Sequence, residues 1–212
     1  MYLQKSLAKS PRWEAGMELV ELITGLFLLG FLQFHLFAVS SIILGAETFN
    51  RDSQFLDEYY ISYIGIPLVI LAILVHGLAA MRKAPWRVEE MRIFLQHSRR
   101  LQHLDTWAWL AQIVTGLAVL VLSAIHIWST LSTWPIEAAK SALRVQTGHF
   151  SFLLALLLVA EIHAMLGLYR ILVKWSWVHR QKFTKYLVYA TLGLVALGFV
   201  ALVVFYFLPT KV

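Results

Sequence analysis

The sequence of 212 residues contains no cysteine, and this absence excludes several kinds of site. Without thiols the chain cannot form a disulfide, ligate an iron–sulfur cluster or attach a haem through a C-x-x-C-H sequence. Proline and glycine are scarce, with five and eleven residues, which argues against a fibrous or disordered chain. A cofactor in this protein would therefore depend on other side chains.

Charged residues are also scarce, since only 14% of the chain is Asp, Glu, Lys or Arg. A soluble domain carries about 25%. Hydrophobic residues make up 59% of the sequence and gather in long runs, which is typical of an integral membrane protein. The net charge of +6 does not indicate a nucleic-acid partner, because the basic residues lie in the gaps between these runs.

Five apolar runs are long enough to span a bilayer, which takes about 20 residues. They cover 19–45, 61–82, 106–132, 146–172 and 185–208. No small-residue cleavage site follows the first run, so we expect a retained helix there. The charged segment 87–100 is expected to form an interfacial or aqueous helix. The sequence predicts an all-α membrane protein, a single domain over 1–212 built as a bundle of five transmembrane helices.

The basic residues of the loops predict the orientation of this bundle. Fourteen Lys and Arg residues fall on the side that holds the N-terminus, the segment 82–100 and the connection 170–185. Only four fall on the other side. Because basic loops stay in the cytoplasm, we predict a multi-pass protein of the cytoplasmic (inner) membrane, with its N-terminus inside.

Five of the eight histidines lie inside apolar runs, and one of them, His149, lies near the outer end of the fourth. The orientation gives each of the other four a depth. The first and third spans run outward, which places His35 and His126 toward the outside. The second and fourth run inward, and His76 and His163 come six and seven residues before a basic residue at the cytoplasmic edge. At 1.5 Å per residue these two lie about 10 Å from that edge. The histidines thus divide into an outer pair and an inner pair.

Paired imidazoles at one depth suit b-type haem, which takes axial ligands from opposite sides of an apolar slot. Two haems in series would carry electrons across the membrane. Arg82, Lys83 and Arg170 follow the inner pair, where they would meet haem propionates. A lone histidine can equally be a hydrogen-bonding group between helices, and zinc fits less well because further ligands are lacking at each depth. His149 is the rival ligand on the outer side.

These residues resemble a known family, the membrane-anchor cytochrome b of succinate:quinone oxidoreductases, which include fumarate reductase. The likeness is to the single-polypeptide, five-helix, dihaem type and runs from about Trp13 to Phe207. It rests on TGLFLLGFLQFHLFAVSSIILG, HGLAAMRKAPW, HLDTWAWLAQIVTGLAVLVLSAIH and EIHAMLGLYRILVKWSW. Each stretch reaches a proposed ligand or flanks one.

The resemblance implies the same pairing of histidines as the depths. His76 and His163 would bind a proximal haem b near the cytoplasm, and His35 and His126 a distal haem b. It also implies two partners on the cytoplasmic face, a flavoprotein and an iron–sulfur subunit, and a dimer of such three-subunit complexes.

The resemblance further implies oxidation of menaquinol near the distal haem, with a carboxylate as proton acceptor. Asp57 or Glu58 falls nearest to that position. Trp109 and Arg144 also match family positions near the cofactors.

Glu161 lies two residues from His163 in the fourth run, where a carboxyl group is costly. At 100° per residue the two side chains point about 200° apart, so Glu161 is not a partner of His163. The resemblance matches Glu161 to a glutamate proposed to carry protons across the membrane. We therefore expect a proton relay rather than a neutral structural acid.

Two other functions stay open at this point. A cytochrome b of a hydrogenase or formate dehydrogenase would use the same ligands with other partner subunits. A haem-free, proton-coupled transporter would use His and Glu as relay groups, although inverted repeats with broken helices are not seen in the sequence. The physiological direction, fumarate reduction or succinate oxidation, is open as well.

Overall fold

The computed structural model describes residues 11–174, 176–178 and 180–210, and its elements within these ranges are all helical. Five helical stretches there are long and apolar enough to cross a membrane. They are Arg12–Leu44, Ile61–Met81, Leu104–Leu131, Ala138–Val173 and Phe183–Phe207. The prediction of an all-α, multi-pass membrane protein with five spanning helices is therefore confirmed.

The α-helices follow one another along the chain with short connections. They are α2 (Pro11–Ser40), α3 (Ala46–Glu58), α4 (Ile61–Met81), α5 (Val88–Leu101), α6 (Leu104–Leu131), α7 (Ala138–Arg144), α8 (Phe150–Lys174) and α9 (Arg180–Phe207).

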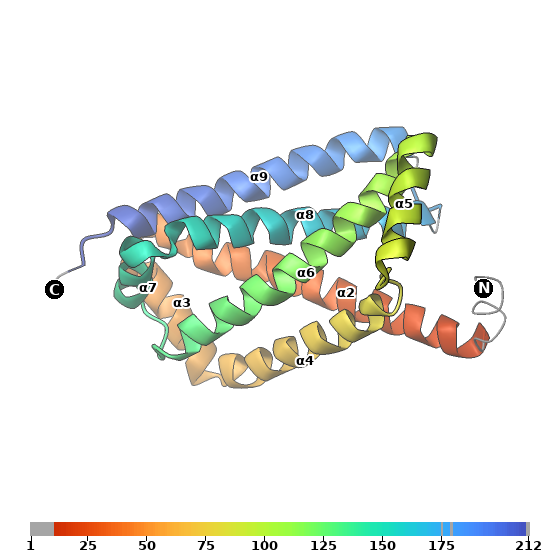
Figure 1. Ribbon diagram of the computed structural model, residues 1–212. Helices are drawn as coiled ribbons and strands as arrows, with labels where there is room; N and C mark the ends of the chain where they lie inside the picture. Colours follow the sequence, from red (N-terminus) through yellow and green to blue (C-terminus); the bar gives the residue numbers. More distant parts are fainter. Residues whose placement is uncertain (1–10, 175, 179, 211–212) are drawn as a thin grey trace.

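Four of the long helices form a ring. α2 packs along α4, α4 touches α6, α6 packs along α8, and α8 touches α2. In this ring α2 stands opposite α6, and α4 stands opposite α8. α9 lies outside the ring against α8 and α2, and the helices run side by side along the molecule (Figure 1).

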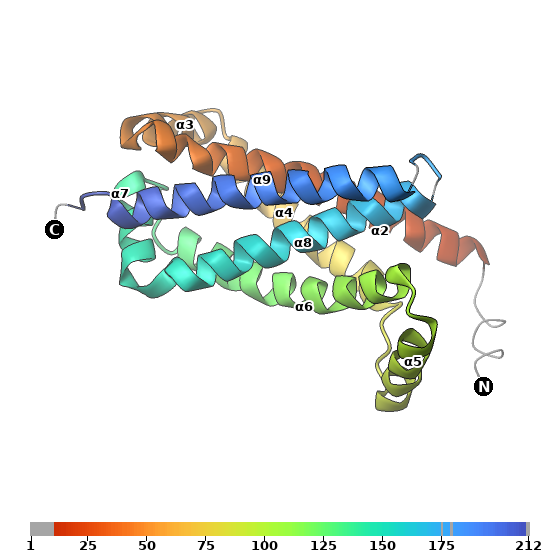
Figure 2. The ribbon, with the colours of Figure 1, turned by 90° about the horizontal axis from the view of Figure 1, so that it is seen from above.

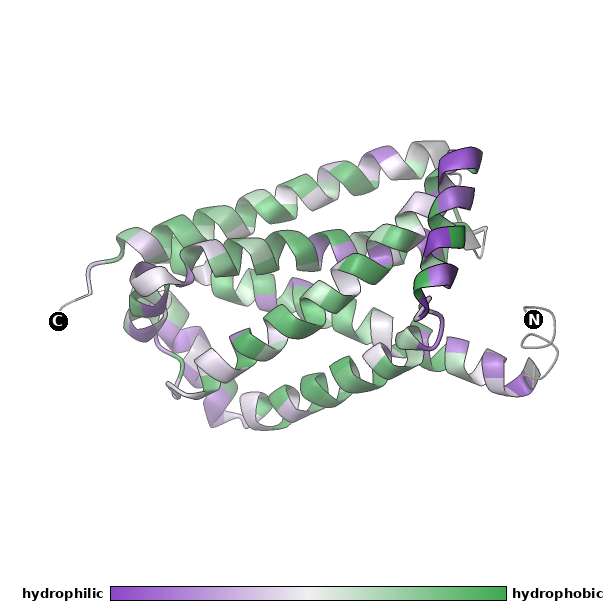
Figure 3. Ribbon diagram, in the orientation of Figure 1, coloured by the Kyte–Doolittle hydropathy of each residue, from purple (hydrophilic) through white to green (hydrophobic). Residues whose placement is uncertain are grey.

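The two ends of the bundle carry different short helices. α5 lies at one end and projects sideways from the bundle, whereas α3 and α7 lie at the other end (Figure 2). Hydrophobic residues dominate the long helices between the ends, and α5 is largely hydrophilic (Figure 3). We call the α5 end the basic end, after its Arg and Lys residues, which include Arg82, Lys83, Arg87, Arg92, Arg99 and Arg100.

Helix α5 is the charged segment that the sequence predicts to be helical but not spanning. Glu89 and Glu90 lie in its first turn and Arg99 and Arg100 in its last turn, which matches the helix dipole. Its Phe94 contacts Trp109 of α6 with ring centroids 4.4 Å apart. This contact holds α5 against the bundle.

The fourth span, Ala138–Val173, contains a kink that the sequence does not predict. The predicted run starts at residue 146, but Val145–His149 is a kinked turn and α8 begins at Phe150. Gly148 has φ 114° in this turn, a conformation open to glycine because it lacks a Cβ atom. Periodicity does not detect such a kink, since the apolar pattern continues through it.

Buried apolar side chains form a cluster at the α3/α7 end. Ile42, Phe49, Ala142, Val145 and Phe205 belong to it. α3 itself occupies the acidic connection between the first two spans. The middle of the four-helix ring is not closed in this way, because a cavity runs through it.

Candidate functional site

A cavity of about 1630 Å³ runs between α2, α4, α6 and α8, and its walls are mostly apolar. All four histidines of the spans line it, two from each pair of opposite helices. The cavity is thus long enough to contain two sites at different depths. Its apolar walls would keep water from groups bound there.

The outer pair joins the opposite helices α2 and α6. The ring centroids of His35 and His126 lie 6.0 Å apart, with their planes inclined by 67°. Phe31, one turn earlier on α2, stacks on His35 with centroids 5.6 Å apart and an angle of 17°. The structure therefore brings together the two histidines that depth alone had paired.

The inner pair joins the other opposite helices, α4 and α8. The ring centroids of His76 and His163 lie 6.5 Å apart, and their planes are inclined by 87°. A metal between two imidazoles, each bonded at about 2 Å, holds ring centres about 6 Å apart. The spacing in both pairs would therefore allow the two imidazoles to hold one metal ion between them.

Two glycines lie directly against the inner imidazoles. A Cβ atom at Gly25 would lie 3.1 Å from Cε1 of His76, and one at Gly116 would lie 2.9 Å from Cε1 of His163. Such distances are too short for an undisturbed contact. At Gly116 a side chain would displace the ring of His163, and at Gly25 the ring of His76 would have to give by a few tenths of an ångström.

A threonine precedes each of these glycines and contacts the same ring. Thr24 Oγ1 lies 3.1 Å from Nδ1 of His76, and Thr115 Oγ1 lies 3.1 Å from Nδ1 of His163. Sequence reasoning missed both threonines. The signal was a repeat, ELITGLFLLGFLQFH against QIVTGLAVLVLSAIH, in which Thr, Gly, Leu and the outer histidine keep the same spacing.

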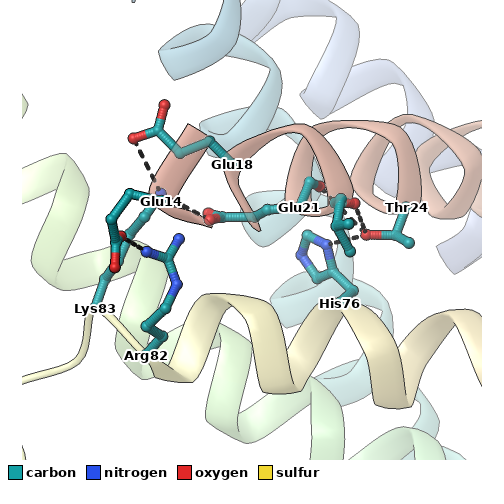
Figure 4. Close-up of polar contacts among 8 residues, drawn as sticks. Glu14, Glu18, Glu21, Thr24, His76, Arg82 and Lys83 are labelled. Carbon is teal, nitrogen blue, oxygen red and sulfur yellow. Dashed lines mark hydrogen bonds and ion pairs between the residues drawn. The ribbon is translucent and has the colours of Figure 1, made fainter. Parts of the chain in front are cut away.

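Arg82 and Lys83, predicted near the haem propionates, are paired with carboxylates of α2. Arg82 forms an ion pair with Glu14. Lys83 Nζ lies 2.7 Å from Oε2 of Glu21 and 3.8 Å from Oε1 of Glu18. Figure 4 shows these side chains between α2 and the end of α4. The contact of Thr24 with His76 lies further along the same two helices.

The other residues predicted near the inner haem lie at the basic end of the cavity. Arg170 and Trp109 both line its wall. Beside Trp109, Tyr169 donates a hydrogen bond to Oδ1 of Asp105 at 3.1 Å, which ties α8 to the start of α6. Of the three predicted cations, Arg170 and Lys83 line the cavity, and Arg82 does not.

Glu161 is fully buried and points to a different helix from His163. Gln33 of α2 donates from Nε2 to both carboxyl oxygens of Glu161, at 3.2 and 3.4 Å. His163 contacts Thr115 of α6 instead. This divergence follows from the 200° between positions two apart on a helix. Sequence reasoning missed Gln33, although an amide two residues before His35 in an apolar run was a signal.

Asp57 and Glu58 lie in the last turn of α3, at the end opposite the basic one. Asp57 is half-buried and Glu58 is exposed. The neighbouring Leu56 lines the cavity, and neither acid does. The structure therefore places both acids next to a lining residue of the cavity and not in its wall.

Arg144 and His149 also line the cavity near this end. Arg144 donates to the backbone oxygen of Ser129 at 3.1 Å, which ties α7 to α6. The ring of His149 contacts Phe152 with centroids 6.1 Å apart. His35 faces His126 and not His149, so the rival ligand is not part of the outer pair.

The fold and the site together define a class of protein. It is a membrane cytochrome of the b type, in which histidines of a transmembrane four-helix ring face one another across an apolar cavity.

Comparison with known proteins identifies the family. The family described as Succinate dehydrogenase/Fumarate reductase transmembrane subunit matches residues 88–205. The fumarate reductase cytochrome b subunit of Helicobacter pylori strain J99 is 34% identical over 184 residues, covering 82% of this chain and 71% of that protein. Its namesake from Wolinella succinogenes is 32% identical over 180 residues, covering 80% and 70%. The chain belongs to the succinate dehydrogenase/fumarate reductase transmembrane subunit family.

Proposed function

We propose that this chain is the dihaem, quinone-reactive cytochrome b subunit of a quinol:fumarate oxidoreductase complex. His76 and His163 would hold one haem b, and His35 and His126 the other. The observation that carries the proposal is the pair of facing imidazole pairs in one apolar cavity. When bound, the two haems supply reversible one-electron carriers at two depths of the membrane.

The spacing along the helices supports two sites in series. Thr24, which contacts the inner pair, and His35 of the outer pair are eleven residues apart on α2. This separation corresponds to about 16 Å along the helix axis. At 100° per residue both side chains also point to nearly the same face, toward the cavity. The chain thus holds the two sites in line between its ends.

The groups at each end of the cavity suggest its two exchange sites. At the basic end, Arg170 faces the cavity and would pair with haem propionates, with Arg82, Lys83 and Trp109 around it. We propose that an iron–sulfur subunit and its flavoprotein dock here, where the basic surface lies. At the α3/α7 end, we propose that menaquinol is oxidised and that Asp57 or Glu58 accepts a proton.

Glu161 is proposed to relay protons, independently of the histidines. It is fully buried, it accepts hydrogen bonds from the neutral amide of Gln33, and it faces α2. A carboxyl group in such a place can hold or release a proton without losing its position, because the amide is retained in both states. The same group has no contact with an inner imidazole and therefore no part in holding iron.

Haem and flavin quantification on the purified complex tests the main proposal. We expect two haem b per chain, reduction of both by menaquinol, and electron delivery to fumarate. A purified complex without b-type haem, or one with nickel or molybdenum in place of flavin, would contradict it.

Substitutions of three carboxyl groups, each with a control, test the proposed proton transfer. Glu161→Gln should keep both haems and lose menaquinol-driven fumarate reduction, whereas Glu47→Gln on the exposed surface of α3 should change neither. Asp57→Asn and Glu58→Gln should slow menaquinol oxidation relative to Asp52→Asn. Full activity in Glu161→Gln would contradict the proposed relay role of Glu161. Full activity in both the Asp57→Asn and Glu58→Gln variants would contradict the proposed proton acceptor.

A further inference from the structure

The two threonines beside the inner histidines have a fixed hydrogen-bonding role. A threonine hydroxyl has one proton to donate. Thr24 Oγ1 donates it to the backbone oxygen of Val20 at 2.6 Å, and Thr115 Oγ1 donates to that of Ala111 at 2.6 Å. Each hydroxyl can therefore only accept a hydrogen bond from the imidazole that it also contacts.

This constraint determines where the imidazole protons lie. The 3.1 Å contacts to His76 and His163 require the proton on Nδ1, which leaves the lone pair of each ring on Nε2. A second contact agrees for His163, because Nε2 of Gln112 lies 3.4 Å from its Nε2 and an amide nitrogen can only donate. Both inner rings are thus presented in the tautomer that binds a metal through Nε2.

The outer pair lacks this arrangement. In the part of the chain that the structure describes, no hydrogen bond joins a ring nitrogen of His35 or His126 to another side chain. The ring of Phe31 stacks on His35 instead. The contrast arises from the repeat, which places a Thr-Gly pair of α2 and of α6 at the inner depth only.

We propose that Thr24 and Thr115 are positioning residues for the inner haem. They fix the tautomer and orientation of its axial histidines and lower its reduction potential. An imidazole that donates from Nδ1 is a more basic ligand, and a more basic ligand stabilises ferric over ferrous iron. The inference rests on the proposed function, since it requires that His76 and His163 bind haem.

Potentiometry of the whole complex, followed by visible absorbance and low-temperature EPR, tests the proposal. The variants are Thr24→Val and Thr115→Val, with Thr24→Ser and Thr115→Ser to restore the hydroxyl. Thr191→Val is the matched control, because Thr191 also donates to a backbone oxygen four residues earlier but lies on α9, away from the histidines. The inner haem is the one that His163→Ala removes.

Each valine variant should raise the midpoint potential of the inner haem and leave that of the outer haem unchanged. We expect about a tenfold change in the ratio of ferrous to ferric iron at a given potential, which is about 59 mV for one electron. The serine variants and Thr191→Val should match the unsubstituted protein. Loss of the inner haem in the valine variants, with retention in the serine variants, supports the same role.

Three results would overturn the proposal. They are an unchanged inner potential in both valine variants, an equal shift of both haems, and equal effects of serine and valine. A complex without any haem would instead contradict the proposed function, so the two failures are distinguishable.

Discussion

The inner and outer histidine pairs have similar ring separations, 6.5 and 6.0 Å, but different surroundings. Hydroxyl groups hold the inner rings, and glycines lie against them. An aromatic ring stacks on one outer histidine. The difference shows how a repeated helix produces two unlike sites, because α2 and α6 offer Thr-Gly at one depth and an imidazole at the other.

The largest effect should come from removing one histidine of a pair. His163→Ala should eliminate the inner haem and retain the outer one, and His126→Ala should do the reverse, because each iron loses an axial ligand. Haem per protein should fall to about half in each variant, as measured by pyridine haemochrome absorbance. Retention of both haems in either variant would contradict the assignment of the two histidine pairs to two separate haems.

A smaller loss should follow from adding one methyl group beside the inner pair. Gly116→Ala places a Cβ atom 2.9 Å from Cε1 of His163. The hydrogen bond with Thr115 opposes rotation of this ring away from the added atom. We expect inner-haem affinity to fall about 10-fold or more, as for other changes that misplace a ligand. Haem retention after dialysis against apomyoglobin measures this.

Gly193→Ala is the control for that substitution, because open space surrounds the position on α9. It should retain both haems. Equal haem loss in Gly116→Ala and Gly193→Ala would indicate a general weakening of the bundle rather than a local effect on His163.

The ion pair at the basic end should contribute to the stability of the inner site. Glu14→Gln leaves the guanidinium of Arg82, whose side chain is 13% exposed, without its charged partner. Because the pair is only partly buried, we expect a loss of about 1–3 kcal/mol, below that of a fully buried pair. Thermal unfolding in detergent, with separate spectra for the two haems, should show earlier release of the inner haem.

Glu137→Gln is the matched change at a more exposed ion pair, which Glu137 forms with Lys140 at 3.2 Å. It should cost no more than about 0.5 kcal/mol. If Glu14→Gln releases both haems together, the ion pair supports the whole bundle and not the inner site.

The smallest effect should come from the ring that stacks on the outer pair. Phe31→Leu removes a contact worth about 0.5–1.5 kcal/mol and frees the His35 ring to rotate. The EPR signal of the outer haem should change, and that of the inner haem should not. Phe37→Leu, at a position 60% exposed on α2, should leave both signals unchanged. A change in the EPR signal of the inner haem alone would show that Phe31 lies beside the inner haem and not beside the outer one.

Much of the fold could be predicted because a membrane span requires a long run of apolar residues, which is visible in the sequence. The five helices and the non-spanning α5 were predicted from length and charge alone. The kink at Gly148 was not, since one glycine in an apolar run leaves the hydrophobic pattern unchanged. The α3 helix was not predicted either, because its polar sequence is equally compatible with a loop.

The sequence by itself determined the depth of each histidine, because the rise per residue of a helix is constant and basic loops orient the spans. That was sufficient to predict which histidines would face each other. Tertiary structure decided which helices stand opposite in the ring, and with this which hydroxyl, glycine or ring meets each imidazole. Those contacts depend on the rotation and packing of helices distant in sequence. No single run of residues therefore encodes the difference between the inner and outer pairs.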